Sequence, residues 1–302
     1  MLSVDKVVIQ TIVDNYIDVF EPSTDKIKRI SPGELKEPLV AGHGLSFLIE
    51  IERGNQTRKI LMDTSHSSHA LLHNLKNLGN EVDDIDTIFL SHGHPDHYGG
   101  LLGFLNSRNK ETPILMHPEG QFPRYIVTPA GVRGPFLFDR EKVKEAGGLI
   151  VEAKNPVSLD IGVLSTGEIE RTTDFEKPWI GPKIVKNHVF QDDYFMDEQA
   201  LVLNVKNKGL VILVGCAHPG VVNIINHAQK LTGINEIYGI IGGFHLTVAE
   251  DEIIEKTVDA FKEKNPSIII PAHCTGFRAM KKISEKMPEQ FFVNCVGTKV
   301  FL

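Results

Sequence analysis

Cysteine is scarce in this sequence, with three among 302 residues: Cys216, Cys274 and Cys295. So few thiols, and an odd number of them, cannot build the disulfide framework of a small secreted protein, and they agree with a reducing compartment. The sequence also lacks any apolar run of the roughly 20 residues that a membrane span needs. Its first residues, MLSVDKVVIQ, lack the basic start, apolar stretch and cleavage site of a signal peptide. We therefore expect a cytoplasmic protein that does not enter a membrane.

Basic charge is in the minority. There are 32 Lys and Arg against 39 Asp and Glu, for a formal net charge of −7, and the pI is about 6.0. Without a global positive field, nucleic acid is not an expected partner. The content of 41% hydrophobic and 24% charged residues is that of a globular chain with a sizeable core. Nothing in the sequence indicates the oligomeric state.

Apolar periodicity predicts two halves built of strands and helices. The first half has strands at 5–13, 45–51, 58–62 and 86–90, a turn at 53–55 and a helix at 67–78. The second half has strands at 200–205, 210–214, 236–241, 267–270 and 291–296, and helices at 221–231, 250–264 and 277–286. Residues 117–198 show scattered Pro, Gly and aromatic residues, with short strands at 149–152 and 163–165. We expect a single domain, 1–302, with an irregular insertion or cap at about 117–198.

Four potential metal ligands follow the strand 86–90 within six residues: His92, His94, Asp96 and His97. Imidazole nitrogen and carboxylate oxygen suit Zn²⁺, Mn²⁺ or Fe²⁺. On a tight loop, alternate residues point in different directions, so two pairs can serve two ions about 3.5–4 Å apart. A single histidine here would be read as a surface residue, but the cluster indicates a metal site. We predict one or two divalent ions, zinc first, with manganese or iron as alternatives.

The pattern His-x-His-x-Asp-His at 92–97 resembles the signature of the metallo-β-lactamase superfamily. That resemblance implies an α/β (α+β) fold, a four-layered αββα sandwich with the site at one edge between two mixed sheets. It also implies that Asp63 is the early aspartate that holds a ligand histidine or loop by hydrogen bonds, although Asp63 could instead cap the next helix. His273 matches the late histidine that completes the second metal position.

Two ligand positions depart from the superfamily pattern. Most members carry a bridging aspartate where this chain has Cys216, and His218 follows two residues later. A thiolate would favour zinc, whereas a ligating His218 leaves manganese or iron open. We prefer His218, because a cysteine after four apolar strand residues is often simply buried. The usual histidine of a Thr-Pro-Gly-His segment is also missing, and either Glu168 or His218 could replace it.

A narrower resemblance rests on four motifs: GCAHPG at 215–220, IGGFHL at 241–246, PAHCTG at 271–276 and STGEI at 165–169. They are similar to those of the branch of 7,8-dihydropterin-6-yl-methyl-4-(β-D-ribofuranosyl)aminobenzene 5′-phosphate synthases. This resemblance implies pterin and phosphate chemistry linked to methanopterin-type cofactors. Within these motifs, His245 could donate a proton to a leaving group or bind a phosphate. It could also be a capping or core residue.

Segment 117–198 supplies a possible lining for a planar ring that carries a phosphate: Arg124, Tyr125, Arg133, Arg140, Arg171, Trp179, Lys183 and Lys186. We single out Arg133 and Arg171 as substrate contacts. The expected function is a metal-dependent hydrolase of an anionic, phosphate-bearing or pterin-like small molecule, in which Asp96 helps to orient the attacking water. The alternatives are a nuclease or phosphodiesterase acting on nucleic acid, or a metal-dependent dioxygenase of the same fold.

Overall fold

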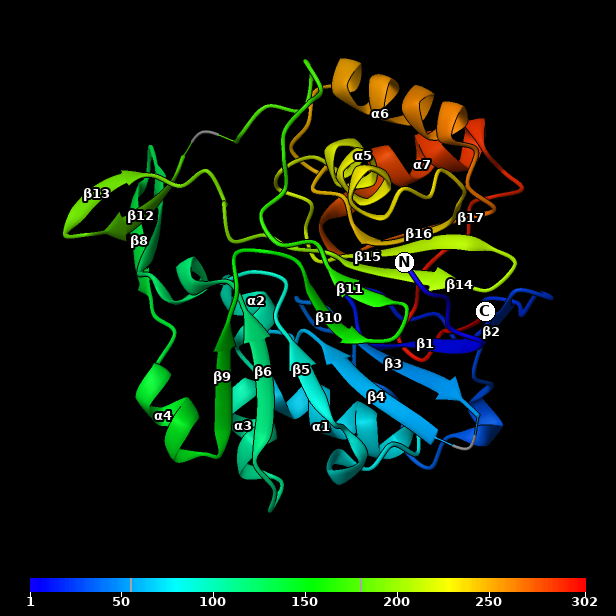
Figure 1. Cartoon of the computed structure of the whole chain (residues 1–302), viewed down its shortest axis with the longest axis horizontal. Helices are drawn as coiled ribbons and strands as arrows, with labels where there is room; N and C mark the ends of the chain where they lie inside the picture. The colour runs from blue at the N-terminus through cyan, green and yellow to red at the C-terminus, as the bar shows by residue number, and fades with distance from the viewer. Residues whose placement is uncertain (55, 180) are drawn as a thin grey trace.

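The computed structural model describes residues 1–54, 56–179 and 181–302, and within them the strands form three sheets (Figure 1). The first sheet has the order β2 (Ile27–Lys28), β18 (Lys299–Phe301), β1 (Lys6–Val13), β3 (Ser46–Arg53), β4 (Gln56–Met62), β5 (Thr87–Phe89), β6 (Thr112–Met116) and β9 (Gly148–Glu152). The second has the order β10 (Val157–Asp160), β11 (Val163–Ser165), β14 (Leu201–Val205), β15 (Gly209–Val214), β16 (Ile237–Gly243) and β17 (Ile268–Ala272). A smaller sheet, here called the outer sheet, has the order β13 (Val189–Asp192), β12 (Pro182–Lys186), β7 (Arg124–Thr128) and β8 (Gly131–Phe136).

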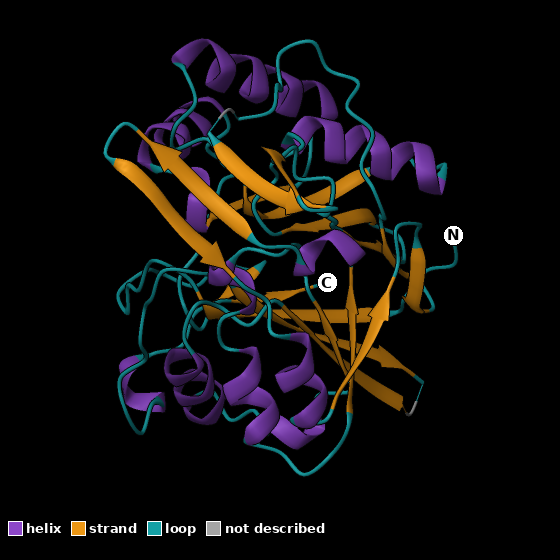
Figure 2. Cartoon of the chain, turned by 90° about the vertical axis from the view of Figure 1, so that its left-hand side faces the viewer, coloured by secondary structure: helices purple, strands orange, loops and turns teal. Residues whose placement is uncertain are grey.

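Helices cover the far sides of the first and second sheets, so the layers run helix, sheet, sheet, helix (Figures 1 and 2). The first sheet carries α1 (Ser68–Asn77), α3 (Leu101–Asn106) and α4 (Arg140–Glu145), and the second carries α5 (Val221–Thr232), α6 (Asp251–Lys264) and α7 (Phe277–Lys286). Buried side chains such as Phe47 and Leu213 join the sheets, Phe104 packs under the first helical layer and Phe261 under the second. The expected four-layered sandwich is confirmed.

Parallel strands direct several loops to one edge of the sandwich. β4, β5, β6 and β9 run parallel in the first sheet, and β15, β16 and β17 run parallel in the second. Loops that leave the carboxyl ends of parallel strands are common ligand sites. Here those loops carry Asp63, His92, Cys216, His245 and His273.

Most predicted elements agree with the structure within two residues, but the strand predicted at 291–296 is wrong. Phe291 forms only an isolated bridge, to Ile269. Beyond it, Asn294 donates a hydrogen bond of 2.7 Å to Asp14, and Gly297 turns the chain with φ 89°. These contacts divert the chain to β1, with which β18 pairs antiparallel.

Segment 117–198 is more regular than its sequence indicates. It forms the outer sheet and also supplies β9, β10 and β11 to the two larger sheets. β13 is exposed along its whole length and β8 is exposed up to Phe136, so no apolar alternation marks these strands. The predicted strands at 149–152 and 163–165 are confirmed. Asn55, in the predicted turn, lies outside the described residues. No helix among the described residues is long and apolar enough to cross a bilayer.

Candidate metal centre

The loop after β5 turns sharply into a short helix. His94 is extended, with φ −93° and ψ 144°, and it precedes α2 (Pro95–Tyr98), whose first residue is proline. Proline is favoured at this position because its φ is already helical and its missing N–H would have no partner there. Asp96 and His97 therefore lie in the first turn of α2, whereas His92 and His94 lie in the loop before it.

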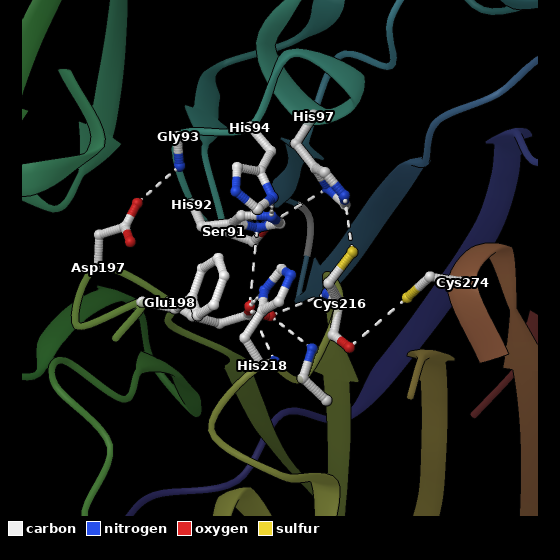
Figure 3. Close-up of polar contacts among 12 residues, drawn as sticks. Ser91, His92, Gly93, His94, His97, Asp197, Glu198, Cys216, His218 and Cys274 are labelled. Atoms are coloured by element: carbon white, nitrogen blue, oxygen red, sulfur yellow. Dashed lines mark hydrogen bonds and ion pairs between the residues drawn. The ribbon is translucent and has the colours of Figure 1, made fainter. Parts of the chain in front are cut away.

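Two groups of donor atoms share the sulfur of Cys216. The donor atoms of His92, Cys216 and His218 lie within 4.8 Å of one another (Figure 3). The donor atoms of His97, Cys216 and His273 also lie within 4.8 Å of one another. Nε2 of His97 is 3.2 Å from Sγ of Cys216. Both groups are buried.

His94 and Asp96 extend the two groups. Nδ1 of His94 is 3.1 Å from Nε2 of His92, and Oδ2 of Asp96 is 3.1 Å from Nε2 of His273. His43, which is exposed, also approaches Asp96, at 3.3 Å, from the Gly-His-Gly turn at 42–44. The sequence analysis did not single out His43, although a histidine between two glycines is a signal that it could have used.

This donor set fits divalent metal ions. Ligands 2.0–2.3 Å from a zinc ion lie roughly 3–4 Å from each other, which matches groups of this size. Burial, together with the neighbouring histidines, lowers the pKa of His92 and of His94 well below the ordinary value. Their imidazoles are therefore neutral, which is the form that binds a metal.

Asp63 orients His97. Its buried carboxylate accepts hydrogen bonds from the backbone N–H and the hydroxyl of Ser91, both 2.7 Å, and from Nδ1 of His97 at 2.6 Å. Burial alone would lower the pKa of His97, but the carboxylates of Asp63 and Asp96 raise it to about 9. Because Asp63 holds Nδ1 of His97, the other ring nitrogen, Nε2, faces Cys216. The alternative role of Asp63 as a helix cap is wrong, because Ser67 caps α1.

Glu198 orients His218 as Asp63 orients His97, and the sequence analysis did not identify Glu198 as a residue of the site. Its fully buried carboxylate contacts Nδ1 of His218 and accepts from the backbone N–H of Cys216 (2.8 Å), Ala217 (2.7 Å) and His218 (3.1 Å). Burial would raise the pKa of Glu198, but His218 and these N–H groups lower it to about 2. The available signal was a pair of acidic residues, Asp197 and Glu198, separated by only two residues from the apolar strand that begins at Leu201.

The structure brings Cys216 and His218 together and leaves Glu168 outside. Glu168 pairs with Nε2 of His117 and Nζ of Lys154, each at 3.1 Å, and does not reach the donor groups. The seven residues predicted as metal ligands do converge: His92, His94, Asp96, His97, Cys216, His218 and His273.

A cavity of about 440 Å³ opens over the donor groups. The outer sheet contributes Tyr125, Arg133 and Phe136 to its wall. Arg171 is not in the wall, because its guanidinium donates to the backbone oxygen of Tyr194 at 2.6 Å. A second cavity, of about 400 Å³ and lined by Arg29 and Cys295 among others, holds none of the donor groups.

His245 lies in the wall of the first cavity. Its ring centroid is 4.5 Å from that of His218 and 5.4 Å from that of Trp179. Both ring nitrogens are buried and have no hydrogen-bond partner among the described residues. The backbone at His245 is left-handed, with φ 47°, an uncommon conformation that is often found at functional sites.

Comparison with known proteins identifies the family. The sequence profile of the metallo-beta-lactamase superfamily matches residues 39–177. A 7,8-dihydropterin-6-methyl-4-(beta-D-ribofuranosyl)-aminobenzene-5′-phosphate synthase of Methanocaldococcus jannaschii is 39% identical over 84% of this chain and 88% of its own length. This chain belongs to the metallo-β-lactamase superfamily. An uncharacterized protein of the same organism is 33% identical over 81% of this chain and 88% of its own.

Solved structures of the superfamily share the fold. That of Tm1679, described as a metal-dependent hydrolase of the β-lactamase superfamily, has a TM-score of 0.77 at 25% identity and covers 97% of this chain and 98% of its own. The metallo-beta-lactamase fold protein YhfI of Bacillus subtilis has a TM-score of 0.56 at 12% identity, covering 99% and 100%, which is a likeness of fold alone. Metallo-β-lactamase proteins commonly bind divalent metals, in agreement with the donor groups found here. The predicted resemblance, to the superfamily and to its branch, is confirmed.

Proposed function

We propose that this metallo-β-lactamase protein is a metal-dependent hydrolase with two ion positions that acts on an anionic small molecule. One observation carries the proposal: two groups of donor atoms share Cys216 beneath a cavity. His92, His94 and His218 would hold the first ion, Asp96, His97 and His273 the second, and Cys216 both. Ions held by these residues would lower the pKa of bound water and would polarise the bond under attack. The cysteine favours zinc, with manganese or iron as alternatives.

The protein's own groups complete the reaction site. Oδ2 of Asp96 faces His43 and His273, and as an acceptor it would orient the attacking water. His245 lies in the cavity wall, and its ring nitrogens have no hydrogen-bond partner in the part of the chain that the structure describes; it would donate a proton to the leaving group. Arg133, also in the wall, would pair with a substrate phosphate.

The substrate class follows from the cavity wall and from the relative's name. Trp179 and Tyr125 offer aromatic surfaces for a planar ring. The relative is named for a product that contains a dihydropterin and a phosphorylated ribofuranosylaminobenzene. A pterin-like or phosphate-bearing substrate is therefore the proposal. Because the relative is named a synthase, a reaction that joins a pterin to an aminobenzene is the second candidate.

Metal analysis combined with a substrate screen tests this proposal. We expect about two zinc, manganese or iron ions per chain and turnover of a phosphomonoester, phosphodiester, lactone or thioester. In ¹⁸O-labelled water, hydrolysis transfers label to the product, whereas a joining reaction does not. His92→Ala and Asp96→Ala should lower turnover about 100-fold or more while circular dichroism shows an intact fold. A metal-free sample as active as the loaded enzyme would contradict the proposal; salt-sensitive RNA cleavage or oxygen consumption would favour the nuclease or the dioxygenase.

A further inference from the structure

Arg124 belongs to the outer sheet but its guanidinium lies against the loop that carries His92 and His94. It is the first residue of β7 and its side chain is only 3% exposed. Nε donates to Asp193 at 2.7 Å, Nη2 pairs with Asp197 at 2.7 Å and Nη1 donates to the carbonyl oxygen of Gly93 at 3.2 Å. One side chain thus joins the outer sheet to the residue between two proposed metal ligands.

Gly93 is held on both sides of its backbone. Its N–H donates to Oδ2 of Asp197 at 2.7 Å, a contact drawn in Figure 3, while its carbonyl accepts from Arg124. A Cβ at position 93 would overlap the carbonyl oxygen of Gly120 and the guanidinium of Arg124. The loop is therefore packed so closely against Arg124 and Gly120 that position 93 has no room for a side chain.

A contribution to the stability of the fold does not by itself explain this arrangement. Three charged side chains, Arg124, Asp193 and Asp197, are at most 3% exposed, and burying such groups costs much of what their attraction returns. What they add is geometry, because the planar guanidinium has donors at fixed angles that can meet two carboxylates and a carbonyl at once. These contacts fix the backbone of Gly93, and the backbone of Gly93 in turn sets the orientation of His92 and His94.

We propose that Arg124 is a positioning residue, which holds the His92–His94 segment in its ligand conformation from the outer sheet, so that the affinity for a divalent ion depends on this arginine. The inference rests on the proposed metal centre. Arg124 and the next two residues of β7, Tyr125 and Ile126, line the cavity. The same strand therefore contacts the substrate space and fixes the metal loop.

Arg124→Lys tests the proposal, with Arg140→Lys as the matched control. Lysine keeps the charge, but its single ammonium cannot reach two carboxylates and a carbonyl together. Arg140 is also ion-paired in segment 117–198, to Glu152 at 2.6 Å, and does not contact the metal loop. Zinc affinity is measured by chelator competition, and ligand geometry by the visible spectrum of the cobalt-substituted protein. We expect about 10–100-fold weaker binding of at least one ion and an altered cobalt spectrum in Arg124→Lys, and less than about twofold change in Arg140→Lys.

Asp193→Asn provides a second measurement, which also decides the case if Arg124→Lys does not fold. Asp193 touches the guanidinium through Oδ2 but does not touch Gly93, and its Oδ1 accepts from the backbone N–H of Phe195 at 2.9 Å. Asparagine keeps an amide oxygen for that N–H and loses the charge that pairs with Arg124, so a loss of zinc affinity is assigned to the pairing with Arg124. We expect a loss smaller than that of Arg124→Lys but above about twofold. Unchanged zinc affinity and cobalt spectrum in a folded variant, or an equal loss in Arg140→Lys, would overturn the positioning role. If the wild-type protein binds no ion, the proposed metal centre itself fails, so the two failures are distinguishable.

Discussion

Glu198 and His218 form a buried pair in which the carboxylate contacts Nδ1 of the ring. The same carboxylate accepts from three successive backbone N–H groups, starting at Cys216. The His218 ring also stacks on Phe195, with centroids 4.1 Å apart and planes inclined by 10°. Glu198 therefore fixes both the loop after β15 and the orientation of His218.

Glu198→Gln should destabilise the protein and weaken metal binding. Glutamine has one acceptor oxygen and places an amide N–H₂ where the carboxylate accepts hydrogen bonds. We expect a fall of roughly 2–4 kcal/mol in the free energy of unfolding, measured by urea denaturation. In the control Glu168→Gln, the lost pairs are partly exposed, and the fall should stay below about 1 kcal/mol. Equal falls in the two variants would show that Glu198 has no special role.

Cys216 should determine how many ions bind and which metal is preferred. Cys216→Ala removes the sulfur that both donor groups share, so metal analysis should show about one ion in place of two. Cys216→Asp introduces the residue that most superfamily members carry, and it should restore two ions with a preference shifted from zinc towards manganese or iron. Cys295→Ala, buried away from the donor groups, is the control. Two tightly bound ions in Cys216→Ala would rule out the shared ligand.

His245 should act in turnover and not in metal binding. His245→Gln removes the proposed proton donor, and we expect kcat to fall about 10²–10⁴-fold with metal content unchanged. His69→Gln, on the exposed side of α1, should match the wild type. The donor atoms of His245, Cys216 and Cys274 also lie within 4.8 Å of one another. A loss of metal in His245→Gln would thus make His245 a ligand instead of a proton donor.

Glu176 should make stability depend on pH. Burial raises its pKa to about 7 from an ordinary 4.5, even though it accepts hydrogen bonds from the N–H groups of Val222 and Asn223 at the start of α5. The folded protein therefore holds this proton more tightly than the unfolded chain. The resulting stability is present below about pH 4.5 and is lost as pH rises through 7, by at most about 3 kcal/mol.

Urea denaturation between pH 4.5 and 8 measures this contribution. The free energy of unfolding of Glu176→Gln should fall less than that of the wild type as pH rises, so that the difference shifts in favour of the variant. A difference that stays constant with pH would show that the pKa of Glu176 is the same in the folded and unfolded states.

Local patterns predicted the part of the site that is contiguous in the sequence. His92, His94, Asp96 and His97 stand together after an apolar strand, and both features are visible in the sequence. The supports of the site are not local. Glu198 and Asp197 look like an ordinary polar stretch in the sequence. In the fold, Glu198 lies against the loop that carries Cys216, and Asp197 lies against Gly93, between His92 and His94.

The outer sheet escaped prediction for a different reason. Its strands are held by backbone pairing, as between β12 and β13, and the side chains of β8 and β13 are almost all exposed. Apolar periodicity indicates a strand when one face of that strand is buried, and it gives no signal when neither face is buried. Arg124 therefore appeared as one of several basic loop residues, and its buried contacts with Asp193 and Asp197 became visible only in three dimensions.

The spacing of the proposed metal ligands along the chain determines when the metal centre can be completed during synthesis. Cys216 follows His97 by 119 residues, and His273 comes later still. At about 5–20 residues per second, a ribosome needs roughly 6–24 s to pass from His97 to Cys216. During that interval the nascent chain presents three histidines and an aspartate with no sulfur ligand. The proposed metal centre is therefore complete only after the second half of the sandwich has been translated and has closed against the first.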